Sequence, residues 1–219
     1  MKFKINYNKK FYLRLFWTLF ALPFVTLFII LTLISQEVFG PMPSFEQLEN
    51  PENNLASHVY SENGDLLGKY YVQNRSYIDF EKIPSKVVNA LIATEDIRFY
   101  EHSGIDARGL GRVFFKTILL GKSSGGGSTI TQQLAKNLFP RDTTIYGSKL
   151  AYATNLVLAK FKEWITAAKL ERNYTKKEIL AMYLNTVPFG GITYGIKSAS
   201  RTYFNTHPDS LKLEEAATL

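Results

Sequence analysis

A long apolar run without a charged residue, residues 17–34, most constrains how this chain can fold. It reads WTLFALPFVTLFIILTLI. A helix needs about 20 apolar residues to cross the hydrocarbon core of a membrane, and the run reaches that length when it is extended back to Phe11, past Arg14. Pro23 would kink such a helix, which membrane helices tolerate. We therefore expect a membrane anchor over residues 15–36.

The charges around this run predict its orientation. Residues 1–35 hold five basic residues and no acidic one, whereas the remainder holds 21 basic against 19 acidic residues. Basic flanks stay in the cytoplasm, so residues 1–14 are expected to form a cytoplasmic tail and the body to lie outside. A cleaved signal peptide is the alternative, but the run is long and no small-x-small cleavage site follows Ile34. The weak basic excess of the body argues against nucleic acid as a partner.

The remaining sequence predicts a linker and then one mainly helical domain. Prolines and little periodicity mark residues 37–56 as the linker, and residues 57–219 form the domain. Asn63-Gly64 between two β-prone runs predicts a short hairpin. The last helical pattern is cut off, so we expect the chain to be part of a longer one. A first helix is predicted to open near Ser85 and to lead into Glu95-Asp96. Further helices are predicted, from apolar spacing and capping residues, at about 109–120, 129–139, 149–172, 176–185, 196–204 and 211–219.

Titratable residues gather at the end of the first of these helices. Glu95, Asp96, Arg98 and His102 lie within eight residues of one another. A carboxylate at the edge of an apolar helix face suits acid–base chemistry, and Arg98 would share a helical face with Glu95. The plainer alternative is a salt-bridge cluster on the surface. A lone histidine is more often a hydrogen-bonding residue than a metal ligand, so we interpret His102 as structural support.

The glycine-rich loop 121–127 and the helix after it form a second candidate site. The loop lacks the first glycine that a nucleotide-binding P-loop requires. Free N–H groups at a helix start nevertheless favour an anion, and Thr129 with Gln132 can form a capping box. Thr129, Gln133 and Lys136 share one face of the predicted helix. This polar face is interpreted as a binding stripe, with a merely solvated face as the alternative.

A third candidate is Glu163, which lies one helical turn after Lys160. An acid flanked by lysines suits chemistry with a negatively charged leaving group. A surface pair between residues i and i+3 is the plainer interpretation, because such pairs are common on solvated helices. The chain contains no cysteine, which excludes disulfides and cysteine-ligated zinc.

Taken in order, these blocks closely resemble the motifs of the peptidoglycan glycosyltransferases, the glycan-polymerising domains of class A penicillin-binding proteins and of monofunctional transglycosylases. The resemblance covers roughly residues 80–219. One departure is Ala159, where the family usually has arginine before the lysine of its third motif. The matching stretches are Glu95-Asp96-x-x-Phe99-x-x-His102-x-Gly104-x-Asp106, then GGSTITQQLAKN at residues 126–137, then Lys160-x-Lys162-Glu163, and then residues 179–190.

The resemblance implies a mainly α, lysozyme-like fold with a membrane-contacting subdomain, for which residues 113–120 are the candidate. It implies that lipid II is both donor and acceptor for β-1,4 glycan strands, formed with inversion. Glu95 matches the general base, and Glu163 matches the acid that assists departure of the pyrophosphate. The other positions that match substrate-binding or site-holding residues of the family are Asp96, Arg98, Phe99, His102, Arg112, Ser128, Thr129, Gln133, Lys136, Lys160 and Asn185.

The resemblance also implies a location and partners. The protein would be a single-pass type II protein of the bacterial inner (cytoplasmic) membrane that binds lipid II, a lipid-linked glycan chain and other cell-wall synthesis or division proteins. A divalent cation is the one cofactor implied, although no ligand set is legible. A transpeptidase domain after Leu219 would make the whole protein a bifunctional penicillin-binding protein. The alternatives are a membrane-anchored lysozyme-like hydrolase, to which the lysines would be of no use, and a non-catalytic scaffold.

Overall fold

The computed structural model describes residues 9–44, 57–64, 66–70, 74–119, 121, 126–140 and 148–219. The predicted cytoplasmic tail, linker and glycine-rich loop therefore lie partly outside the described residues. The chain divides into two compact units, Met1–Met42 and Pro43–Leu219.

The first unit is dominated by one long apolar helix, α1, which spans Lys9–Ser35. Its 27 residues correspond to about 40 Å at 1.5 Å per residue, more than the ~30 Å hydrocarbon core of a bilayer. Pro23 lies inside this helix. Within the part of the chain that the structure describes, α1 is the one helix long and apolar enough to cross a membrane.

The second unit opens on the predicted hairpin. Strands β1 (Ser57–Tyr60) and β2 (Leu66–Tyr70) pair antiparallel, and Gly64 in the turn between them has a φ of +87°. Glycine adopts this conformation at no steric cost, as an Asn-Gly turn requires. A second pairing was not predicted: β3 (Asn74–Arg75) runs parallel to β4 (Thr193–Tyr194), so the two ends of the domain sequence meet.

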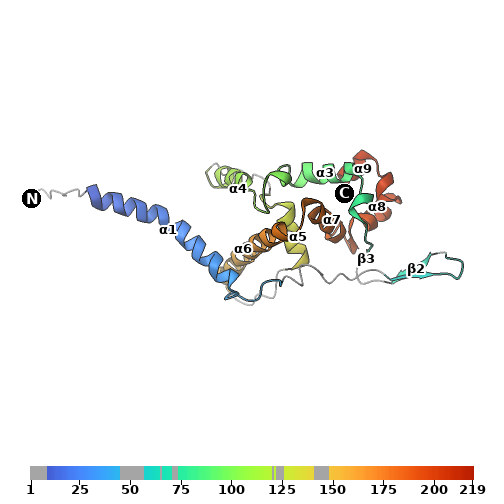
Figure 1. Ribbon diagram of the computed structural model, residues 1–219, viewed down its shortest axis with the longest axis horizontal. Coiled ribbons are helices and arrows are strands. Elements are labelled where there is room, and N and C mark those ends of the chain that lie inside the picture. Colours follow the sequence, from blue (N-terminus) through green and yellow to red (C-terminus); the bar gives the residue numbers. More distant parts are fainter. Residues whose placement is uncertain are drawn as a thin grey trace, which may run out of the picture. The chain divides into compact units, whose positions relative to one another are not determined.

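The rest of the second unit is mainly helical, as predicted (Figure 1). Helix α5 packs against both α6 and α7, and α3 packs against α9. The predicted helix over residues 109–120 consists instead of a short α-helix, α4, followed by a π-helical segment, η3. The helical segments are η1 (Phe80–Lys82), α3 (Ser85–Glu95), η2 (Phe99–Glu101), α4 (Ala107–Val113), η3 (Phe114–Leu119), α5 (Ile130–Leu138), α6 (Lys149–Asn173), α7 (Lys176–Thr186), α8 (Ile196–Phe204), η4 (Pro208–Ser210) and α9 (Leu213–Thr218).

Local sequence sets several of the helix boundaries. A capping box, which the spacing Thr175-x-x-Glu178 indicates in the sequence, is present at the start of α7. The Thr175 hydroxyl accepts a hydrogen bond from the Glu178 N–H, and the Glu178 carboxylate accepts one from the Thr175 N–H at 2.7 Å. Ser148 caps α6 by accepting from the N–H of Ala151 at 3.3 Å. Helix α8 ends at Asn205, which is left-handed with a φ of +50°.

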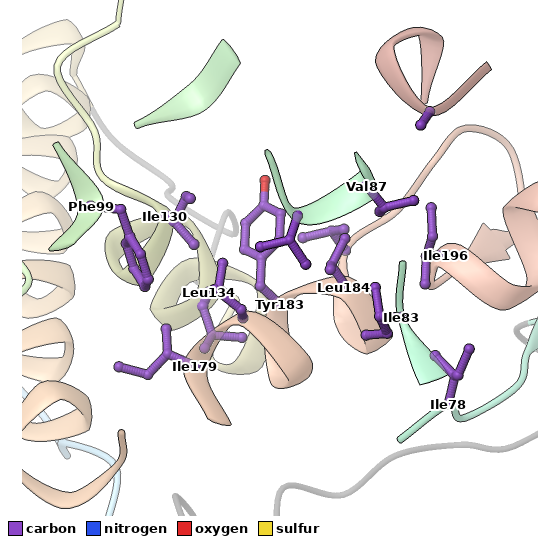
Figure 2. Close-up of a cluster of buried hydrophobic side chains, with 14 of the residues drawn as sticks. Ile78, Ile83, Val87, Phe99, Ile130, Leu134, Ile179, Tyr183, Leu184 and Ile196 are labelled. Atoms are coloured by element: carbon purple, nitrogen blue, oxygen red, sulfur yellow. The ribbon is translucent and has the colours of Figure 1, made fainter. Parts of the chain in front are cut away.

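The hydrophobic core gathers around α5 and α7 (Figure 2). Ile130 and Leu134, one turn apart on α5, and Ile179 and Leu180 on α7 are completely buried. This spacing places an apolar stripe of each helix toward the other elements. Phe99, from the first motif block, is also completely buried in this core. The helices that carry the candidate residues are therefore fixed by packing.

Candidate active site

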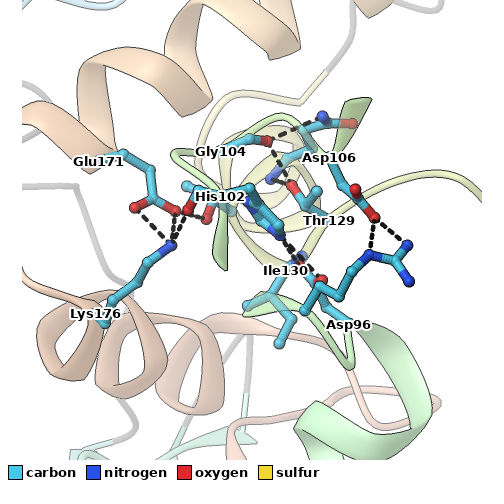
Figure 3. Close-up of polar contacts among 11 residues, drawn as sticks. Asp96, His102, Gly104, Asp106, Thr129, Ile130, Glu171 and Lys176 are labelled. Atoms are coloured by element: carbon cyan, nitrogen blue, oxygen red, sulfur yellow. Dashed lines mark hydrogen bonds and ion pairs between the residues drawn. The ribbon is translucent and has the colours of Figure 1, made fainter. Parts of the chain in front are cut away.

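Asp96 ties the end of α3 to the start of α5 (Figure 3). Its buried carboxylate accepts a hydrogen bond from the backbone N–H of Ile130 at 3.1 Å. The Nε2 atom of His102 lies 3.0 and 3.1 Å from the two carboxylate oxygens. Because Ile130 is the first residue of α5, its N–H is one of the free groups that favour a negative charge. The anion predicted at this helix start is therefore, at the Ile130 N–H, the Asp96 carboxylate of the protein itself, and His102 supports that carboxylate.

Thr129 and Gln132 fasten the start of α5 to the loop after η2. The Thr129 hydroxyl donates to the carbonyl of Gly104 at 2.7 Å and accepts from the N–H of Gln132 at 3.2 Å. The Gln132 side chain donates to the same Gly104 carbonyl at 3.0 Å, so only half of the predicted capping box forms. Gly104 has a φ of +84°, and a Cβ there would lie 3.0 Å from the carbonyl oxygen of Ala167, so a side chain does not fit.

Glu95 is the last residue of α3, and its side chain is exposed. Its Oε2 accepts a hydrogen bond from Nε2 of Gln133 at 2.7 Å. The same side chain lines a cavity of about 350 Å³ whose other lining residues, from α3, α7, the segment that follows α7, α8 and the region of α9, are mostly apolar. Since Asp96 is held in the core, the backbone next to Glu95 is fixed while its carboxylate remains accessible. This is the arrangement expected for a carboxylate at an apolar edge.

Glu163 and Lys160 form an ion pair on α6 in which Glu163 is buried and Lys160 is partly exposed. Lys160 Nζ lies 3.1 Å from Oε2 of Glu163 and also donates to the Ser128 hydroxyl at 2.7 Å. Ser128 directly precedes Thr129, the N-cap of α5, so the pair brings a cation beside the start of that helix. The interpretation as a surface pair is wrong, because Glu163 is only 6% exposed.

Arg98 does not share a helical face with Glu95. That prediction fails because α3 ends at Glu95. The Arg98 guanidinium instead donates to the carboxylate of Asp106, with Nε 3.1 Å from Oδ2. This hydrogen bond holds the pKa of Asp106 below its usual range. Arg98 therefore braces the segment between η2 and α4.

The remaining predicted site residues divide into buried and exposed ones. Phe99 belongs to the core. Asn185 is buried, and its side chain accepts from the N–H of Ile78 and donates to the carbonyl of Ile78, both at 2.9 Å. These two residues hold the fold. Arg112 on α4 and Lys136 on α5 have exposed side chains.

Sequence reasoning assigned no role to Lys176 or Tyr183. Lys176 Nζ donates to the His102 carbonyl at 2.7 Å and to Glu171 at 2.8 Å, and it lies 4.2 Å from the centre of the Phe99 ring (Figure 3). The sequence could have indicated that Tyr183 makes a hydrogen bond, because a tyrosine on the apolar face of a helix usually has a hydroxyl that needs a partner. No pattern in the sequence indicates the contacts of Lys176.

The divalent cation implied by the resemblance finds no ligand set in this region. Among the residues that the structure describes, no three histidine, aspartate or glutamate side chains gather in a way that could hold a metal ion. The two lysine-containing clusters described above place cations, rather than groups of carboxylates, beside the start of α5 and beside His102.

Replacing Asp96 by asparagine is expected to lower the free energy of unfolding by about 3 kcal/mol, because one amide oxygen cannot replace a carboxylate that contacts both His102 and the N–H of Ile130. Urea unfolding of the chain in detergent, followed by circular dichroism, measures the loss. Asp209→Asn is the matched control: Asp209 is exposed and contacts His207 and Ser210 at the surface, where such pairs contribute little, so its unfolding curve should stay close to that of the parent. An Asp96→Asn variant as stable as the parent would contradict the role of this carboxylate.

The exposed carboxylate of Glu95 and the pair of buried Glu163 with partly exposed Lys160 thus both contact residues at or near the start of α5, as the motif resemblance leads one to expect. The family model described as Transglycosylase matches residues 63–219. The chain therefore belongs to the transglycosylase family, as the motifs predicted.

The particular relatives are penicillin-binding proteins. The chain is 45% identical over 165 residues to penicillin-binding protein 1F of Bacillus subtilis (strain 168), which covers 75% of this chain and 21% of that protein. It is 38% identical over 196 residues to penicillin-binding protein 1A of Aquifex aeolicus (strain VF5), covering 89% and 25%. It is 36% identical over 180 residues to penicillin-binding protein 1A of Escherichia coli (strain K12), covering 81% and 20%. The matched region spans a quarter or less of these relatives.

Proposed function

We propose that this chain is a peptidoglycan glycosyltransferase of cell-wall synthesis that polymerises lipid II into β-1,4 glycan strands. Membership of the transglycosylase family supports the reaction class. The observation that carries the proposal is that both acids are linked to the same helix start. Glu95 is hydrogen-bonded to Gln133 of α5, and Lys160, which pairs with Glu163, is hydrogen-bonded to Ser128 just before α5.

In the proposed reaction Glu95 is the general base. It takes the proton from the 4-hydroxyl of the incoming lipid II as that oxygen attacks the anomeric carbon of the lipid-linked chain. The bond between this carbon and the pyrophosphate oxygen breaks, and attack from the opposite face inverts the configuration. The accessibility of the Glu95 carboxylate supports this role, because a base must reach the proton that it removes.

Lys160 and Glu163 act on the leaving group. The pyrophosphate gains negative charge as it departs, and a fixed ammonium group stabilises that charge. Glu163 holds the ammonium in place from α6, and Ser128 holds it at the start of α5. Because Ala159 stands where the family usually has arginine, Lys160 carries a larger share of this stabilisation.

The proposed setting is the bacterial inner membrane. Helix α1 serves as the single type II anchor, with the domain outside the cytoplasm. Phe114 and Phe115 on η3 are 59% and 55% exposed, and we assign this apolar segment to contact with the bilayer that holds the lipid substrate. Other cell-wall synthesis proteins, and a transpeptidase domain of the same longer chain, are the proposed partners.

The test is glycan polymerisation from lipid II by the purified chain in detergent. The expected result is a ladder of glycan strands made from lipid II alone, with no shortening of finished strands added in a parallel reaction. A hydrolase would shorten the finished strands and leave lipid II unused. A scaffold would change neither substrate, and either of these two outcomes would overturn the proposal.

A further inference from the structure

We propose that Tyr183 is a positioning residue for Glu95 and acts through the side-chain amide of Gln133. The inference rests on the proposed function, in which Glu95 is the base. The Tyr183 hydroxyl donates to Oε1 of Gln133 at 2.9 Å, and Nε2 of Gln133 donates to Oε2 of Glu95 at 2.7 Å. The three side chains come from α7, α5 and α3 in turn. One chain of hydrogen bonds thus connects three helices and ends on the proposed base.

The direction of the Gln133 amide decides what Glu95 meets. A glutamine side chain donates from its nitrogen and accepts at its oxygen, and a carboxylate can only accept. The Tyr183 hydroxyl donates to the amide oxygen, which leaves the amide nitrogen facing Glu95. If the amide were reversed, its oxygen would face the carboxylate oxygen and repel it. The carboxylate thus sets the orientation of the amide, and the hydrogen bond from Tyr183 to the amide oxygen holds the Gln133 side chain in that orientation.

Tyr183 is well placed to hold this orientation because its ring is packed. The side chain is only 6% exposed and belongs to the hydrophobic core, where Figure 2 shows it among Leu134 and Leu184. Burial, with the charge of Glu95 as the smaller cause, raises the pKa of Tyr183 well above its ordinary value. The hydroxyl therefore keeps its proton. Glu95, in contrast, is exposed, so a fixed donor restricts a side chain that would otherwise rotate freely.

The test removes the hydroxyl alone with Tyr183→Phe and measures lipid II polymerisation by the full chain. We expect kcat to fall about tenfold with KM nearly unchanged, the size of effect that the loss of one hydrogen bond has on a rate. In a Gln133→Met background the same substitution should change kcat by less than twofold, because the path to Glu95 is already cut. Melting temperatures of all variants show whether they are folded.

Tyr203→Phe is the matched control. The Tyr203 hydroxyl donates to the carbonyl of Phe189 at 2.8 Å and has no part in the hydrogen-bond chain, so this variant should keep the parent's rate. If the effects of Tyr183→Phe and Gln133→Met instead multiply, Tyr183 acts independently of Gln133 and the inference is overturned. An unaltered chain that makes no glycan would count against the proposed function, not against the hydrogen-bond chain.

A second readout needs no activity. The side-chain amide resonances of Gln133, observed by NMR in glutamine-labelled protein, report the partner of each amide hydrogen. They should shift in Glu95→Gln, which changes the acceptor, and also in Tyr183→Phe, which releases the amide. Resonances that are the same in Tyr183→Phe as in the parent would overturn the inference whether or not the chain polymerises lipid II.

Discussion

Replacing Glu95 by glutamine is expected to reduce lipid II polymerisation by about 100- to 10,000-fold, the range typical of a lost general base. The amide has nearly the same shape but takes no proton from the acceptor hydroxyl. Stability should stay the same, because the Glu95 side chain is exposed and its loss leaves no buried group without a partner. Initial rates of glycan formation in detergent, together with thermal melting, measure both effects.

Glu81→Gln is the control for this variant. Glu81 is an exposed glutamate on η1 and gives the same change of charge outside the candidate site. It should polymerise at the parent's rate. Should Glu95→Gln retain even half of the parent's rate, the proton must go to another group, and the role proposed for Glu95 would have to be abandoned.

Replacing Glu163 by glutamine is expected to lower the polymerisation rate by about 100-fold, the lower end of the range for losing a catalytic acid or base. The neutral amide no longer fixes the ammonium of Lys160, which also contacts Ser128, so the cation is no longer held where we propose that the pyrophosphate leaves. Rates from lipid II, measured with saturating substrate, separate this loss from weaker binding.

A glutamate with a purely structural role provides the comparison for Glu163. Glu178 accepts hydrogen bonds from Thr175 in the capping box of α7, and these bonds lower its pKa. Glu178→Gln should lower the melting temperature without lowering the rate per folded molecule. If Glu163→Gln behaves in the same way, its carboxylate only supports the fold, and the proposed part in pyrophosphate departure is wrong.

Much of the helical framework could be predicted because it depends on nearby residues. The capping box at Thr175 and the caps at Thr129 and Ser148 each act within three residues, so they are legible in the sequence. The predicted helix over 196–204 coincides with α8, which the left-handed Asn205 ends. The hairpin turn was predicted from equally local information, the Asn63-Gly64 pair. Such features fix where helices begin and end, although not what they touch.

The candidate site was harder to predict because its contacts connect distant residues. Asp96 and Ile130, or Lys160 and Ser128, are more than 30 residues apart, and no periodicity reports such a pair. The burial of Glu163 was missed because an acid and a lysine one turn apart have the same spacing in the sequence whether the acid is buried or lies on a solvated helix face. Arg98 was misplaced because the helix was continued past Glu95. Motif resemblance brought these residues together where spacing could not.

The parallel pairing of β3 with β4 has a consequence for the order in which the domain is built. Asn74 and Arg75 pair with Thr193 and Tyr194, and the Asn185 side chain binds Ile78, a residue 107 positions earlier. At synthesis rates of about 5–20 residues per second, roughly 5–20 s separate the two partners of that last contact as they leave the ribosome. The segment around Ile78 therefore cannot complete its contacts until Asn185 has been synthesised. A chain interrupted before residue 185 leaves this segment without a partner, so we expect quality-control proteases to find it there.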